Sequence, residues 1–152
     1  MKLKRICAVL LTALLCVCVS IPAFAADDNG RVVSRTVEQY ENGAYAVVTV
    51  YDDTIARAGT KTGHKDYKYY VSGSLAWTYT VHGSFRYNGS SASCTAASAT
   101  CDIRDSGWKL TSNEAYPSGS AAVANGTMRR SSDGREVYPK VTLTCTPNGV
   151  LA

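Results

Sequence analysis

The chain has 152 residues, of which 45% are hydrophobic and 18% charged, and its formal net charge at pH 7 is +4. Three of the 16 basic residues, Lys2, Lys4 and Arg5, lie at the amino terminus, so the rest of the chain carries a formal charge of only +1. A nearly neutral chain without a basic face argues against binding to nucleic acid or to an anionic membrane surface.

The first segment, Met1–Ala25, has the three parts of a secretory signal peptide. Its basic start is followed by an apolar run from Ile6 to Val19 and by the small-x-small triplet Ala23-Phe24-Ala25. The apolar run is about 14 residues long, shorter than the about 20 residues that a membrane-spanning helix needs. We therefore expect cleavage after Ala25 (or after Ala26), which leaves residues 26–152 as one secreted extracellular domain with no membrane anchor.

The mature part alternates apolar and polar residues with period two, and no window of eleven or more residues carries a helical stripe. The expected strands are Arg31–Tyr40, Gly43–Asp52, Asp66–Gly73, Leu75–Tyr87, Ser90–Ala96, Gly107–Ala115, Ser120–Ser131 and Arg135–Thr146. The expected longer loops are Ala56–Lys65 and Ala97–Ser106. About eight short strands joined by turns such as Asn-Gly predict an all-β fold, a single antiparallel β-sandwich of the immunoglobulin-like kind.

The longest alternating stretch, Leu75–Tyr87, places its large apolar side chains on one face. The odd positions are Leu75, Trp77, Tyr79, Val81, Gly83, Phe85 and Tyr87. This row is either a platform for sugar rings or one wall of the core. Burying a large apolar side chain stabilises a fold by about 1.5–3 kcal/mol, and the remaining apolar residues are mostly Ala and Val. We therefore predict that the row is buried, with a bulge or bend at Gly83.

A candidate binding patch precedes this strand. Tyr67, Tyr69 and Tyr70 include two consecutive residues, so their rings must point to both faces of a strand and at least one should be exposed. Tyrosine rings are amphipathic and suit a recognition surface. Loops on a rigid scaffold often carry function. We therefore name His64, in the neighbouring loop, and the three tyrosines as candidate binding residues.

The mature part keeps three cysteines, Cys94, Cys101 and Cys145, in an oxidising compartment. Cys94 and Cys145 both alternate with small or apolar residues, which places them on inward faces of separate strands. We favour a Cys94–Cys145 disulfide, with Cys101 as a spare thiol. Three single pairings remain open, and a Cys94–Cys101 bridge would close a small loop.

The pattern W-x-Y-T-V-x-G-x-F-x-Y-N-G-x-x-A-x-C-T, followed by W-K-L-T-S and V-T-L-T-C-x-x-N-G, covers much of Lys61 to Leu151. It resembles small uncharacterised secreted proteins of Gram-positive bacteria. The resemblance implies a β-sandwich and an exported product, and its cysteine pattern matches Cys94 and Cys145. It implies no activity and no catalytic residues.

Motifs for chemistry are scarce. The only histidines are His64 and His82, and there is no Gly-x-Ser-x-Gly elbow. The cysteines and histidines lack zinc-site spacing, and no acidic cluster fits an EF-hand loop. We therefore expect no catalytic residues, metal or cofactor.

The functional hypothesis is a secreted, non-catalytic recognition or interaction module for an extracellular protein or glycan. One alternative is a secreted hydrolase that uses His64 or the acidic residues. The other is a secreted antagonistic or inhibitory protein.

Overall fold

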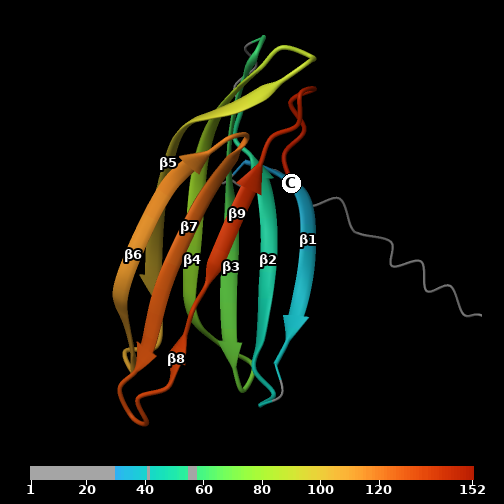
Figure 1. Cartoon of the computed structure of the whole chain (residues 1–152). Helices are drawn as coiled ribbons and strands as arrows, with labels where there is room; N and C mark the ends of the chain where they lie inside the picture. Colours follow the sequence, from blue (N-terminus) through green and yellow to red (C-terminus); the bar gives the residue numbers. More distant parts are fainter. Residues whose placement is uncertain (1–29, 41, 55–57) are drawn as a thin grey trace, which may run out of the picture.

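The computed structural model of the protein describes residues 30–40, 42–54 and 58–152. The described residues form β1 (Arg31–Gln39), β2 (Tyr45–Asp52), β3 (Thr60–Val71), β4 (Ser74–Tyr87), β5 (Ala92–Ile103), β6 (Trp108–Ser118), β7 (Ala121–Arg130), β8 (Glu136–Val137) and β9 (Lys140–Thr144) (Figure 1). They contain no helix, and therefore none that is long and apolar enough to cross a bilayer. The all-β prediction is confirmed. The predicted signal peptide lies outside the described residues.

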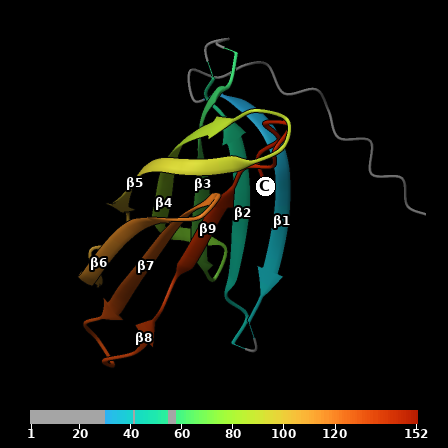
Figure 2. The ribbon, with the colours of Figure 1, turned by 45° about the horizontal axis from the view of Figure 1, so that its top comes forward.

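The strands form two antiparallel sheets. β1 to β5 make a five-stranded sheet in which each strand pairs with the next in sequence. In the second sheet β7 pairs with β6, β8 and β9. β7 contacts β4 and β5, β9 contacts β3 and β4, and Figures 1 and 2 both show β7 and β9 in front of the larger sheet. The two layers are sandwich-like, but the consecutive order of β1 to β5 differs from immunoglobulin domains, whose sheets combine non-consecutive strands.

The odd row of β4 faces the second sheet and forms the centre of the core. Trp77, Tyr79 and Val81 are 0% exposed and Phe85 is 1% exposed, so the prediction of a buried row is confirmed from Trp77 to Phe85. Leu75 is an exception, because it is only half-buried and lies opposite Tyr70. The core cluster also takes Trp108 from β6. Because these rings are enclosed between the sheets, they cannot serve as a platform for sugar rings.

The aromatic rings of the core contact one another directly. Tyr69 on β3 stacks on Trp77, with ring centroids 4.9 Å apart and planes 11° apart. Trp108 meets both rings edge-on, at 5.7 Å from Tyr69 and 6.2 Å from Trp77. Such aromatic pairs contribute about 0.5–1.5 kcal/mol each beyond their buried area. The cluster therefore ties β3, β4 and β6 together across the two layers.

Gly83 makes room for a neighbouring ring. A Cβ at this position would lie 2.6 Å from Cζ of Phe85 and 3.0 Å from Cβ of Ala122 on β7. The bulge or bend predicted at Gly83 is not found there, because Gly83 pairs regularly with Gly63 on β3 and with Ala97 on β5. The pairing of β4 with β5 shifts between Ser84 and Phe85, where the extra residue is Thr95 of β5. β4 remains in the five-stranded sheet along its whole length.

The predicted hairpin turns are present in the structure, but much of each of the two predicted loops is β-strand. Gly43 and Gly89 adopt positive φ in the predicted turns that follow β1 and β4. However, Ala97–Ile103 belongs to β5, where it pairs with β4 from Gly83 to Trp77. Thr60–Lys65 likewise belongs to β3, while the first two residues of that predicted loop lie outside the described residues. Small residues such as Ala, Ser and Thr give weak strand signals, and pairing with an apolar neighbour strand overrides them.

Candidate functional site

The structure separates the four predicted binding residues onto two faces of the sheet. Tyr67 and Tyr69 are only 6% and 1% exposed, because they lie opposite Tyr79 and Trp77 and share their core face. Their burial removes them from the candidate contact surface. Tyr70 and His64 are half-buried on the outer face of the larger sheet, so only these two remain accessible to a ligand.

Aromatic pairs between β2 and β3 stiffen this outer face. Tyr45 stacks on Tyr70 with ring centroids 4.7 Å apart, and Tyr51 stacks on His64 at 4.4 Å. Each ring covers one face of its partner, so these residues do not offer a wide flat surface for stacking. Their contribution is to fix the side chains of β3, including the imidazole of His64.

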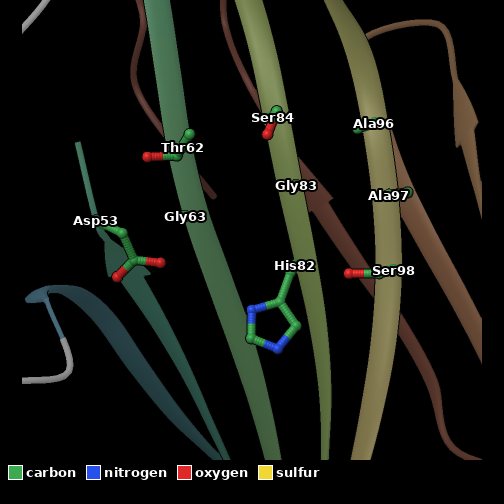
Figure 3. Close-up of a pocket in the computed structure, with 9 residues that line it drawn as sticks. All are labelled: Asp53, Thr62, Gly63, His82, Gly83, Ser84, Ala96, Ala97 and Ser98. Atoms are coloured by element: carbon green, nitrogen blue, oxygen red, sulfur yellow. The ribbon is translucent and has the colours of Figure 1, made fainter. Parts of the chain in front are cut away.

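A shallow depression of about 230 Å³, which we call the outer hollow, lies beside the Tyr51–His64 pair (Figure 3). Its lining residues are Asp53, Thr62, Gly63, His82, Gly83, Ser84, Ala96, Ala97 and Ser98. Small side chains on three adjacent strands, β3, β4 and β5, leave the depression open. Figure 3 shows the hydroxyl of Ser98 directed toward His82, with Asp53 on the far side of β3.

A carboxylate and two imidazoles meet at one end of the outer hollow. Asp53 Oδ2 lies 2.7 Å from Nδ1 of His64, and the ring centroids of His64 and His82 are 5.6 Å apart. His82 Nε2 lies 3.3 Å from Oγ1 of Thr100. Burial lowers the pKa of His82, and the neighbouring His64 lowers it further. Both effects favour the neutral form of the His82 imidazole.

The alternation within Leu75–Tyr87 puts His82 on the polar face of its strand, but nothing in the sequence connects it with Asp53 or His64. Asp53 is 11 positions before His64, and His82 is 18 positions after it. No linear motif has this spacing. The pairing of β3 with β4 sets His64 opposite His82, so the cluster could be predicted only if the register of this hairpin were known.

The chemistry available to the cluster is limited by its partners. Among the described residues, Thr100 is the only hydroxyl residue hydrogen-bonded to either histidine ring. The same part of the chain contains no group of three or more His, Cys, Asp or Glu residues arranged to hold a metal ion. The Asp53–His64 pair can hold a proton or orient an imidazole, but no serine or cysteine among the described residues forms a triad with it.

Cys94, Cys101 and Cys145, the three cysteines among the described residues, are free thiols in the structure, in contrast to the predicted disulfide. The backbone N–H groups of Cys94 and Cys145 donate to the adjacent carbonyls of Gly119 (2.8 Å) and Ser120 (2.9 Å), so both cysteines border the β6–β7 turn. Cys101 instead lies 3.7 Å from the Met128 sulfur. Burial raises the pKa of all three thiols.

The structure excludes one of the alternative disulfide pairings. Cys94 and Cys101 lie on the same strand, β5, seven residues apart. A β-strand rises about 3.3 Å per residue, which separates the two by about 20 Å. Because a disulfide needs Cα atoms within about 7 Å, these two cysteines cannot bridge within one folded chain.

Fold and site together define a two-sheet antiparallel β protein with a small polar depression on the outer face of its larger sheet. Comparison with known protein families, with curated proteins and with solved structures finds no match to this chain.

Proposed function

We propose that the protein is a secreted, non-catalytic recognition module that binds an extracellular glycan or protein through the outer hollow. Export rests on the signal-peptide pattern of Met1–Ala25. Recognition rests on the hollow itself, because it lies on three hydrogen-bonded strands that hold its lining in place. Rigid, concave sites with a few convergent polar groups are the usual form of binding sites in proteins.

The lining of the hollow suits a polar ligand. The hydroxyls of Thr62, Ser84 and Ser98 can each donate and accept hydrogen bonds, and the carboxylate of Asp53 accepts them. No lysine or arginine is among the lining residues. The chemistry therefore favours hydroxyl- and amide-rich groups, such as those of a sugar ring or a polar peptide segment, over an anionic ligand.

Filling the hollow should abolish recognition without unfolding the protein. Ser98 is exposed on β5, so Ser98→Tyr places a large side chain in the hollow and is expected to weaken binding at least tenfold. The mature protein, residues 26–152, would first be screened against glycans and extracellular proteins. The affinity of each variant for the ligand found would then be measured by surface plasmon resonance.

Ser93→Tyr is the matched control for this substitution. Ser93 is also exposed on β5 but does not line the hollow. It is expected to leave the affinity and the circular dichroism spectrum unchanged. Equal affinity of the Ser98→Tyr variant and the wild-type protein would reject the hollow as the binding site.

The hydrolase alternative keeps one observation in its favour, the 2.7 Å contact between Asp53 and His64 beside a depression that contains two serines. A carboxylate that orients an imidazole is one part of a nucleophilic triad. The hydroxyl that would complete the triad is not hydrogen-bonded to His64 in the described part of the chain. Turnover of a simple ester by the mature protein, lost in His64→Ala, would favour this alternative over the non-catalytic module.

A further inference from the structure

We propose that His64 and His82 together chelate a divalent first-row transition-metal ion, with Asp53 as the carboxylate that orients His64. The two histidines lie directly opposite each other on β3 and β4. Their ring centroids are 5.6 Å apart and their planes differ by 37°. This metal site borders the outer hollow, whose lining includes Asp53 and His82, but it does not require the proposed recognition function.

The separation of the two rings matches that of two imidazoles on one ion. Metal–nitrogen bonds of about 2.0–2.1 Å place each ring centroid about 3.2 Å from the ion. For N–metal–N angles between tetrahedral and linear, the two centroids then lie about 5–6.3 Å apart. The observed 5.6 Å falls inside this range, so the two rings are close enough to share one ion.

Each ring also has a nitrogen that makes no hydrogen bond to another described residue. The contact between His64 Nδ1 and Asp53 leaves Nε2 of His64 available, and the contact between His82 Nε2 and Thr100 leaves Nδ1 of His82 available. Figure 3 shows one ring nitrogen of His82 directed toward β3, the strand that carries His64. A carboxylate on the remote nitrogen of a ligating histidine is the usual outer partner of a metal site, since it fixes the tautomer and orients the ring.

The surroundings hold the pair in place. Tyr51 stacks on His64 at a centroid distance of 4.4 Å, which restricts rotation of that ring. Both histidines sit within hydrogen-bonded strands, so little conformational freedom is lost when an ion binds.

The ion's remaining ligands would be water. No third His, Cys, Asp or Glu ligand is in place among the described residues, but the adjoining outer hollow, of about 230 Å³, has room for water molecules. Imidazole ligands favour zinc, copper and nickel over calcium or magnesium. The His64–His82 pair should therefore bind Zn²⁺ and Cu²⁺ but not Ca²⁺.

The test is direct because the chain has only two histidines, so every imidazole in the untagged mature protein belongs to this pair. Calorimetric titration with Zn²⁺ is expected to show one ion per chain. Electron paramagnetic resonance of the Cu²⁺ complex is expected to show coupling to two imidazole nitrogens. The proposal is overturned if neither ion binds, or if the bound Cu²⁺ shows no nitrogen coupling.

Substitution of the proposed ligands and of Asp53 tests which side chains bind the ion. His64→Ala and His82→Ala are each expected to weaken Zn²⁺ binding at least tenfold. Asp53→Ala keeps both imidazoles and is expected to weaken it about tenfold, the usual loss when an outer partner is removed. Asp102→Asn, an exposed carboxylate on β5, is the control and should bind as the wild type does.

The histidine variants retain all three cysteines, so binding that persists in them would belong to thiols and would refute the proposal. Circular dichroism shows whether each variant is folded. A His82→Ala variant that is folded and binds Zn²⁺ as tightly as wild type would also refute it.

Discussion

The Tyr69→Ala variant is expected to be about 3–5 kcal/mol less stable than the wild-type domain, whereas Tyr70→Ala is expected to lose about 1 kcal/mol. Tyr69 is 1% exposed and its ring contacts Trp77 and Trp108 between the sheets. Tyr70 is half-buried on the outer face and stacks on Tyr45. The same substitution at adjacent positions therefore removes a core ring in one case and a surface ring in the other.

Guanidinium unfolding followed by circular dichroism measures both losses. The pair of variants is its own control, because the chemical change and the strand are the same. Equal destabilisation at the two positions would show that β3 does not separate a core face from an outer face at Tyr69 and Tyr70. A larger loss at Tyr70 would reverse the assignment of the two faces.

The second prediction concerns the cysteines under oxidising conditions. We expect residues 26–152, once oxidised, to join Cys94 and Cys145 in a disulfide, although both are free thiols in the structure. The bridge would link β5 of the larger sheet to the residue that follows β9 of the smaller one. It would close a loop of about 50 residues, which contributes about 4 kcal/mol through the reduced entropy of the unfolded chain. Reduction should therefore lower the free energy of unfolding by about that amount.

The measurement compares unfolding with and without dithiothreitol, after treatment of the folded protein with oxidised glutathione. The two thiols lose two electrons and two protons, and oxidised glutathione becomes two reduced molecules. Peptide mapping should then find a Cys94–Cys145 link and one remaining thiol, Cys101. Three titratable thiols in the denatured, unreduced protein would contradict the prediction, as would a Cys94–Cys101 link.

Much of the fold follows from the alternation of residue types. The large rings at Trp77, Tyr79 and Phe85 occur two apart, and a strand turns residues with that spacing to one face. Because these rings supply much of the chain's large apolar surface, they had to lie in the core. The strand at Ala97–Ile103 was missed because its small side chains have little preference of their own and become a strand by pairing with β4.

The pairing of His64 with His82 depends on a register shift between β3 and β4 that the sequence pattern does not reveal. Beyond the Ser72–Gly73 turn, Tyr70 lies opposite Leu75, and an unbroken register would set His64 opposite Val81. One extra residue in β4, Ala76, shifts the register so that His64 faces His82.

The carbonyl of Ala76 accepts hydrogen bonds from the amides of Arg104 and Asp105, each at 2.9 Å. These two residues follow β5, about 28 positions later in the chain. The bulge is therefore tied to a long-range contact. A local pattern contains no signal for such a contact, and so it could not predict the histidine pair.

Intrinsic fluorescence of the mature domain tests the buried aromatic row most directly, because Trp77 and Trp108 are the chain's only tryptophans and are 0% and 2% exposed. The account predicts blue-shifted emission that acrylamide quenches several-fold less than the emission of the guanidinium-unfolded chain. Emission and quenching that match the unfolded chain, in a protein whose circular dichroism still shows β-sheet, would mean that the indoles face water and would contradict the two-layer core.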